Sequence, residues 1–228
     1  MSVISDILSI LFPQICHVCN KKLNSQENFL CQHCIERLPR TMYHRREFNP
    51  MEQRFAGKTK IERATGLIFY DRSSNYASII HDFKYRGYSK LAVFIGKLMA
   101  KELYISGFFN DIDCITPVPL HSIKEAKRGY NQSLKIAAGV SEITNKPIVN
   151  NLKLNNWRST QTMKTSLERW KNRKDSCIVI DSKVYDNKHI LIIDDVCTTG
   201  ATLETLAETI LKSSPTARIS LLTFAVTP

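Results

Sequence analysis

Short apolar runs alternate along this chain with longer segments whose apolar residues recur every three or four positions. The short runs lie at residues 64–70, 112–116, 147–154, 177–180, 190–193 and 218–226. Runs of this length, bounded by turn residues, predict buried strands. The longer segments, at residues 89–104, 131–142 and after residue 202, predict helices with one apolar face. The alternation predicts an α/β fold, a parallel sheet with flanking helices.

The start of the chain is apolar but does not have the pattern of a signal peptide. Ile4, Ile7, Leu8 and Leu11 predict a short amphipathic helix that docks on the body of the protein. No basic segment precedes these residues and no small-residue cleavage site follows them. No apolar run in the chain approaches the ~18–20 residues needed to span a bilayer. The sequence therefore predicts a cytoplasmic protein without a membrane span, in which disulfides are not expected.

Two C-x-x-C pairs stand close together near the start of the chain. Cys16 and Cys19 form the first pair, and Cys31 and Cys34 form the second. Two such pairs predict a structural four-cysteine zinc site, with His33 as an alternative ligand. A redox pair and an iron–sulfur cluster are the competing interpretations. We expect residues 1–50 to form an N-terminal helix and zinc module, and residues 51–228 to form a second domain.

Two adjacent carboxylates, Asp194 and Asp195, directly follow the apolar run at residues 190–193. A short loop of Thr, Gly and Ala comes next, and then a helical pattern begins. Ligands of open α/β folds bind at the carboxyl edge of the sheet, and a helix start favours phosphate. Carboxylates would repel a phosphate, but they suit sugar hydroxyls or the shell of a magnesium ion.

This stretch resembles the phosphoribosyl-pyrophosphate (PRPP) loop of type I phosphoribosyltransferases, in which an apolar strand leads into an acidic pair and then T-T-G-A-T. The resemblance implies that Asp194 and Asp195, the catalytic candidates, hold the ribose hydroxyls, and that PRPP binds together with magnesium. The loop would wrap the 5′-phosphate. The implied PRPP-binding residues are Asp194, Asp195, Val196, Cys197, Thr198, Thr199, Gly200, Ala201 and Thr202.

Three further segments extend the resemblance over nearly the whole chain. Residues 117–132 are similar to the P-V-P-L-H…R-G-[FY]-N-Q signature of the ComF (competence protein F) family. Residues 83–87 resemble its F-K-Y-x-G segment, and residues 161–172 resemble its Q-T…R-[WF]-x-N spacing. The resemblance implies a type I phosphoribosyltransferase-like domain with an N-terminal zinc module. It also implies a link to DNA uptake and natural transformation.

Basic residues after the proline-bracketed segment at residues 117–119 suit a pyrophosphate group. We read this stretch as a loop that presents His121, Lys124 and Arg128 to an anion. The basic segment from Lys153 to Lys174 is interpreted either as a lid over the site or as a solvated loop. No pattern in the sequence identifies the acceptor nucleophile.

The formal net charge of +11 is typical either of a solubilising surface or of a protein with a polyanionic ligand, which could be nucleic acid, an anionic membrane or a phosphorylated substrate. Aromatic residues among the charges, Trp157 and Trp170 above all, could stack on bases, although buried aromatics are more common. The resemblance to ComF proteins adds single-stranded DNA as a partner. The residues predicted to bind it are Lys84, Arg86, Arg158, Arg169, Lys171 and Arg173.

Three hypotheses for function follow. The chain could be a phosphoribosyltransferase of nucleotide metabolism, similar to amidophosphoribosyltransferases, that acts on an unknown acceptor. It could be a DNA-processing factor that keeps the PRPP site as a sensor or a relic and binds single-stranded DNA through its basic face. It could be a scaffold whose zinc module docks a competence helicase or recombination mediator. The intact acidic pair and phosphate loop favour a working PRPP site in each case.

Overall fold

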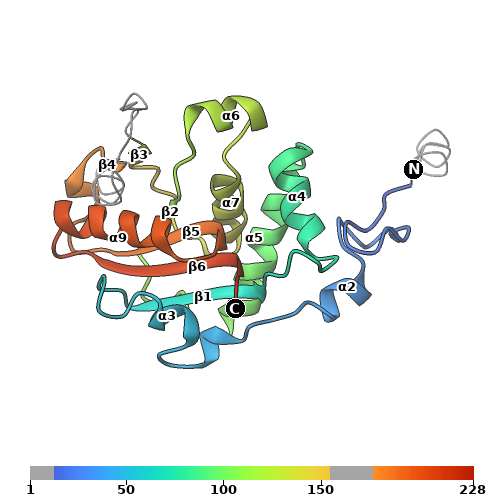
Figure 1. The fold of residues 1–228 in the computed structure, drawn as a ribbon, viewed down its shortest axis with the longest axis horizontal. Helices are drawn as coiled ribbons and strands as arrows, with labels where there is room; N and C mark the ends of the chain where they lie inside the picture. Colours follow the sequence, from blue (N-terminus) through green and yellow to red (C-terminus); the bar gives the residue numbers. More distant parts are fainter. Residues whose placement is uncertain (1–12, 155–176) are drawn as a thin grey trace, which may run out of the picture.

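A four-stranded parallel sheet, in the order β1-β6-β5-β2, forms the centre of the molecule (Figure 1). The computed structural model describes residues 13–154 and 177–228. Each strand pairs in parallel with its neighbours, as the alternating sequence pattern predicts. The strands of this sheet are β1 (Arg63–Phe69), β2 (Cys114–Pro117), β5 (His189–Cys197) and β6 (Arg218–Val226).

Helices cover both faces of the sheet. Figure 1 shows α9 (Ala201–Ser213) in front of the sheet and α5 (Ser89–Tyr104) and α7 (Gln132–Thr144) behind it. Alternate residues of β5 face the two sides, so Leu191 packs in the cluster of α5 and α7, whereas Ile190 packs in the cluster of α9. The predicted fold class is therefore confirmed.

Several shorter elements were not predicted from the sequence pattern. The basic stretch after the prolines is a helix and not a loop, because the His121 side chain caps its start and Gly129, with φ of 79°, ends it. The additional elements are α2 (Gln32–Glu36), η1 (Tyr43–Arg45), α3 (Pro50–Gln53), α4 (Ala77–Tyr85), α6 (Ser122–Arg128) and η2 (Ser182–Tyr185).

Two of the predicted strands lie outside the main sheet. The run at residues 147–154 divides into two parts. Ile148 forms a single parallel bridge to β2, and the rest is β3 (Leu152–Leu154). β3 pairs antiparallel with β4 (Cys177–Val179) in a separate two-stranded sheet. β3 and β4 therefore lie apart from the parallel sheet, because a short apolar run does not specify its partner.

The acidic pair lies within β5 and not in the loop that we expected to follow the strand. Backbone pairing with β6 continues past the last apolar residue, with Asp194 beside Thr223 and Cys197 beside Val226. The pairing holds the backbone of both carboxylates rigid at the carboxyl edge of the sheet. Only the residues after Cys197 form the loop that leads into α9.

The four-cysteine segment packs against α4 and α5, and its buried side chains join the same apolar cluster as those helices. The predicted division at residue 50 stays a prediction. The predicted helix near the start of the chain, from Ile4 to Leu11, lies outside the described residues. Across residues 13–154 and 177–228, no helix combines the length and the apolarity that crossing a bilayer requires.

Candidate functional site

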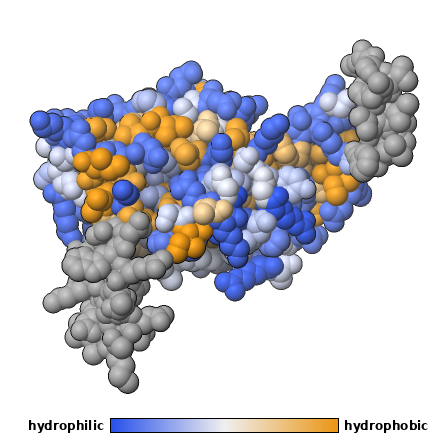
Figure 2. All heavy atoms as spheres, turned by 90° about the horizontal axis from the view of Figure 1, so that it is seen from above, coloured by the Kyte–Doolittle hydropathy of each residue, from blue (hydrophilic) through white to orange (hydrophobic). Residues whose placement is uncertain are grey.

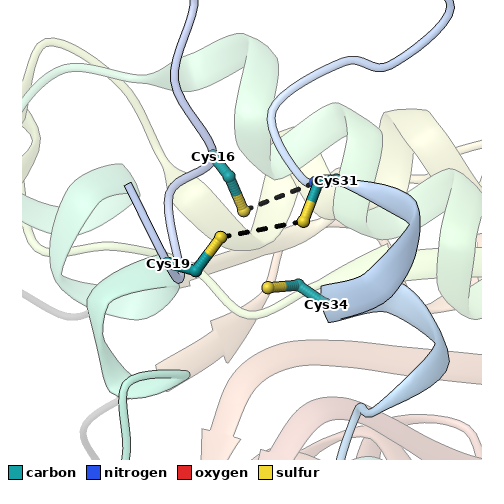
Figure 3. A group of neighbouring side chains, drawn as sticks. All are labelled: Cys16, Cys19, Cys31 and Cys34. Carbon is teal, nitrogen blue, oxygen red and sulfur yellow. Dashed lines mark hydrogen bonds between the residues drawn. The ribbon is translucent and has the colours of Figure 1, made fainter. Parts of the chain in front are cut away.

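Four cysteine side chains converge near the start of the described chain (Figure 3). Cys16 and Cys19 lie on a turn, Cys31 caps α2, and Cys34 lies within that helix. Their sulfur atoms all lie within 4.8 Å of one another, and those of Cys19 and Cys31 are 3.7 Å apart. Sulfurs bound at about 2.3 Å to a tetrahedral zinc ion are about 3.8 Å apart. The cluster therefore has the donors and the spacing of a structural zinc site.

The ionisation of these thiols also fits a metal. Burial opposes ionisation of Cys16, but backbone N–H groups, first that of Cys19, lower its pKa to about 7. Burial raises the pKa of Cys31, and burial together with the neighbouring thiols raises that of Cys34. The pocket therefore favours one thiolate on its own. A divalent cation would offset the charge of further thiolates.

Neither histidine of this segment joins the cysteine cluster. Nδ1 of His17 lies 2.5 Å from Oδ2 of Asp82 on α4, and the edge of its ring meets Tyr88. His33 is exposed on α2. The group of metal-ligating side chains found among the described residues consists of the four cysteines.

Helices α4 and α7 meet the acidic pair near the carboxyl end of β5. Lys84 of α4 places its Nζ 2.9 Å from Oδ2 of Asp195, which is buried. Ser133, in the first turn of α7, donates a 2.8 Å hydrogen bond to Oδ1 of Asp194. The backbone N–H of Asp195 donates to the same oxygen at 2.8 Å. Each carboxylate therefore has its own donor from a different helix.

Residues of the proline-bracketed segment position Ser133. Asn131 caps α7 by accepting hydrogen bonds from the backbone N–H groups of Ser133 and Leu134. Its Nδ2 donates a 2.9 Å hydrogen bond to the Val118 carbonyl, and Tyr130 donates its hydroxyl to the Phe83 carbonyl on α4. This motif therefore ties α4, α7 and the end of β2 around the acidic pair.

The pKa of Asp194, the first residue of the acidic pair, lies well above its usual value. Burial raises the pKa of Asp194 to about 7, and the neighbouring charge of Asp195 adds to the shift. The hydrogen bonds from the Asp195 backbone and from Ser133, and the charge of Lys84, act in the opposite direction. Asp194 is therefore only partly ionised near neutral pH. Hydroxyl donors that enter the site would favour its ionised form.

The loop between β5 and α9 is open to solvent and ends at a helix start without a side-chain cap. Gly200 caps α9 with φ of 82°, and a Cβ there would lie 2.9 Å from the Phe55 ring. Only glycine suits this position. Thr198, Thr199 and Thr202 are exposed. The Ala201 N–H donates to Oγ1 of Thr199 at 3.4 Å, whereas the N–H groups of Thr202 and Leu203 are available to an anion.

Arg54, at the end of α3, supports this loop from behind. Its guanidinium donates to the carbonyl oxygens of Thr198 and Thr227. The sequence gives no signal for this role, because Arg54 belongs to no motif. Ser133 follows the N-Q of the 117–132 segment directly, so its place beside the motif is the one clue to its contact with Asp194.

Cys197 is a packing residue. Burial raises the pKa of its thiol to about 11, and its side chain lies in the cluster under α9. Burial also raises the pKa of Cys114 and of Cys177 to about 11, as expected for small buried hydrophobes. A reactive thiolate at Cys197 is therefore not favoured at neutral pH.

The three pyrophosphate candidates lie on α6 or cap it, and α6 follows the carboxyl end of β2. His121 accepts the Ile123 N–H at 3.3 Å, and Lys124 is exposed. The Arg128 guanidinium lies 5.4 Å from the centre of the Tyr85 ring. Neither Lys124 nor Arg128 forms an ion pair with a described residue, so both charges are available at this edge of the sheet.

Of the predicted DNA-binding residues, only Lys84 and Arg86 are described. The amino group of Lys84 faces the acidic pair, whereas Arg86 borders a separate groove of about 1090 Å³ between the four-cysteine segment and α5. In Figure 2 apolar side chains come to the surface in this part of the molecule, at the right of the view. The predicted residues Arg158, Arg169, Lys171 and Arg173, and both tryptophans, lie outside the described residues.

The groove combines aromatic walls with a basic rim. Lys90 and Lys101 on the rim are exposed and form no ion pair with a described residue, and Lys97 pairs with Glu142 at 2.6 Å. Among the described residues that line it, Asp82 is the only acidic one. The aromatic and imidazole rings that line it are those of His17, Phe29, Tyr88 and Phe94.

The family model described as "Phosphoribosyl transferase domain" matches residues 89–226. The match begins with α5 and ends with β6, so it includes the acidic pair and the loop before α9, but neither the four-cysteine segment nor α4.

Two curated proteins are similar to part of this chain. Competence protein F of Haemophilus influenzae is 28% identical over 102 residues, which are 44% of each chain. Competence protein ComFC of Bacillus subtilis is 31% identical over 108 residues, which are 46% of this chain and 41% of the relative. The chain thus spans less than half the length of the curated relatives it matches.

Among solved structures, the glutamine PRPP amidotransferase from B. subtilis, complexed with ADP and GMP, aligns with a TM-score of 0.43 and 18% identity. The alignment covers 58% of this chain and 26% of that one.

Proposed function

We propose that this chain binds PRPP with magnesium at the carboxyl edge of its sheet. The proposal follows from its membership of the phosphoribosyl transferase domain family, as a ComF-type member. Asp194 and Asp195 accept hydrogen bonds from the ribose hydroxyls. The loop from Val196 to Thr202 and the start of α9 bind the 5′-phosphate. His121, Lys124 and Arg128 bind the pyrophosphate, and the accompanying magnesium ion would offset part of its charge.

The observation that carries this proposal is the arrangement around β5. An acidic pair within a paired strand, with Asp195 buried and Asp194 partly buried, lies directly before a solvent-open loop at an uncapped helix start. The first feature suits neutral hydroxyl donors and the second suits a phosphate, so their order matches a sugar phosphate. Transfer of the ribosyl group breaks the C1–O bond to pyrophosphate through a transition state that resembles an oxocarbenium ion. Carboxylates near the ribose would favour that positive charge.

Isothermal titration of the protein with PRPP in the presence of magnesium tests the proposal. We expect saturable binding at one site per chain. A Gly200→Ala variant, in which a Cβ meets Phe55, is expected to weaken this binding. The proposal is wrong if PRPP produces no saturable heat while the circular dichroism spectrum shows a folded protein.

For the metal site, we propose one structural zinc ion bound by Cys16, Cys19, Cys31 and Cys34. The spacing of the sulfurs supports zinc, as does the sulfur-only donor set. Metal analysis of protein purified without added zinc should give one zinc per chain. A Cys31→Ser variant should contain less, and a Cys114→Ser variant is the matched control. Unchanged metal content in Cys31→Ser would contradict the assignment.

A second candidate function, single-stranded DNA binding, is favoured by the groove between the four-cysteine segment and α5. Its aromatic lining offers stacking surfaces, and its lysine rim offers charge for phosphates. Lys90, Lys97 and Lys101 follow one another at helical spacing, so their amino groups line one edge of the groove. A ComF-type role in DNA uptake would use this surface alongside the PRPP site.

Charge reversal tests the DNA proposal. Lys90→Glu with Lys101→Glu should weaken binding of an oligothymidylate strongly and reduce its salt dependence by about two counterions. Lys212→Glu, at the end of α9, is the control. If the double variant binds as well as the unmodified protein, the groove is not the DNA site. If PRPP displaces all bound DNA, the two ligands share the site at β5.

A further inference from the structure

Helix α4 contacts the four-cysteine segment on one side. Ser78 donates its hydroxyl to the His17 carbonyl at 2.5 Å, and Oδ2 of Asp82 lies 2.5 Å from Nδ1 of His17. Just before the helix, Tyr76 donates its hydroxyl to the Cys34 carbonyl at 3.0 Å. Ser78 and Asp82 are four residues apart, so they share one face of the helix. That face is therefore joined to the first C-x-x-C pair, and Tyr76 joins the start of the helix to the second.

The opposite side of the same helix reaches the acidic pair. Lys84 follows Asp82 by two residues, which turns it about 200° around the helix axis. Among the described residues, Lys84 is the only cation that forms an ion pair with either carboxylate, at 2.9 Å from Asp195. The lysine side chain is 20% exposed and that of Asp195 is 6% exposed. An ion pair this sheltered is screened weakly by solvent.

We propose that Lys84 is a positioning residue of the acidic pair, and that the four-cysteine segment holds it in place through α4. The proposal rests on the PRPP site proposed above. Two adjacent carboxylates repel each other, and the Lys84 ammonium offsets that repulsion at Asp195. Lys84 therefore holds the Asp195 carboxylate in place for the ribose hydroxyls without contacting PRPP itself.

The dependence on the four-cysteine segment follows from the length of α4. A helix of nine residues is marginal on its own in water, so its placement depends on tertiary contacts. Ile79, Ile80 and Phe83 anchor one part of it in the core. The polar contacts to His17 and Cys34 fix the remaining face. Loss of these contacts would let the helix rotate and withdraw Lys84 from Asp195.

The first experiment measures the affinities of Mg–PRPP and of ribose 5-phosphate by calorimetry. Lys84→Met should lower both affinities by the same factor, about tenfold, because the lysine acts on the ribose carboxylates. Lys84→Arg should recover most of the loss, and Lys212→Met is the control. A loss for PRPP alone would mean that Lys84 contacts pyrophosphate directly, and no loss for either ligand would mean that it has no role. Both results overturn the proposal.

The second experiment tests whether the four-cysteine segment holds Lys84 in place through α4. Tyr76→Phe with Ser78→Ala removes two hydrogen bonds to the four-cysteine segment without changing a cysteine. In the unmodified background this change should weaken PRPP binding about threefold. In the Lys84→Met background it should have no further effect, because the side chain that it displaces is absent. Equal effects in the two backgrounds, or none in either, would show that the four-cysteine segment does not hold Lys84 in place.

These outcomes separate the inference from the function on which it rests. If the unmodified protein does not bind Mg–PRPP, the proposed function fails and the inference fails with it. If the unmodified protein binds and Lys84→Met binds equally well, only the inference fails.

Discussion

Both ends of the main sheet carry a cluster of acidic and basic side chains, and the two clusters differ in how the acids are matched. At the amino end, the Asp111 carboxylate pairs with Arg63, Arg218 and His189, which lie at the starts of three strands. At the carboxyl end, Asp195 pairs with Lys84, and Asp194 forms no ion pair with a described residue. One carboxyl with several donors contrasts with two carboxyls beside one cation.

The titration of the two clusters follows from this difference. Burial opposes ionisation of Asp111, but the nearby Arg63, His189 and Arg218 hold its pKa below the usual value. At Asp194, burial and a neighbouring carboxylate raise the pKa to about 7. A carboxyl that is fully matched contributes to the fold, whereas a carboxyl left in excess is available to a ligand. The contrast therefore assigns structure to one end and binding to the other.

The largest effect is expected from removing the excess acids. Asp194→Asn with Asp195→Asn should lower the affinity for Mg–PRPP at least about 100-fold, because two hydrogen-bond acceptors for the ribose lose their charge. Calorimetry measures the affinity, and circular dichroism checks the fold. Asp111→Asn, the matched change at the other end, should leave affinity unchanged. If the double variant binds Mg–PRPP as tightly as the unmodified protein, the proposed difference between the two ends of the sheet has no basis.

The second prediction concerns the pH dependence of stability. The pKa of Asp194 rises from 3.8 to about 7 on folding, so the native state keeps a proton that the unfolded chain releases. This contribution to stability is present below about pH 4 and is lost as the pH rises to about 7.

An Asp194→Asn variant has no such proton, so its stability does not fall in this way as the pH rises. Its free energy of unfolding minus that of the unmodified protein should therefore grow from pH 4.5 to 7.5. We expect a change on the order of 2 kcal/mol, measured by urea unfolding. The four-cysteine segment also responds to pH, but it is common to both proteins and cancels in the difference. A constant difference across the range would show that Asp194 titrates normally.

The sequence pattern predicts the frame of the molecule but not the partners of its charges. Helices such as α5 and α9 and the strands of the main sheet were found from periodicity, because burial against the sheet imposes that periodicity. The acidic pair was predicted to lie in a loop because the apolar run stops at Ile193. Its pairing with Thr223 depends on a strand that comes later in the chain.

Lys84 shows the same limit for the candidate site. Its basic neighbours in the sequence suggested a DNA-binding surface, yet its amino group lies at Asp195. Local charge patterns cannot specify which anion a lysine faces, because the partner is brought near only by the fold. Arg54 contacts the loop without any local signal, and only the place of Ser133 beside the 117–132 segment hints at its contact with Asp194.

The third prediction tests the amino-end cluster. Asp111→Asn should lower the free energy of unfolding by about 1 kcal/mol at pH 7, since the ion pairs are partly exposed and screened by solvent. The lowered pKa gives stability that is present above the unfolded pKa and lost as the pH falls. The deficit of the variant should therefore shrink on acidification, opposite to the trend for Asp194→Asn. A deficit that grows in acid would contradict the assignment.

The smallest effect is expected at Ser133, which donates to Asp194 from the start of α7. Ser133→Ala removes one hydrogen bond of about 0.5–1.5 kcal/mol, so affinity for Mg–PRPP should fall about threefold. Ser141→Ala is the control, because its hydroxyl bonds the Lys146 carbonyl near the other end of the same helix. Without the serine, Asp194 also loses a donor to its ionised form, so the pH at which PRPP affinity is half-maximal should move upward. A threefold loss with an unmoved pH profile would mean that Ser133 positions α7 and does not act on the carboxylate.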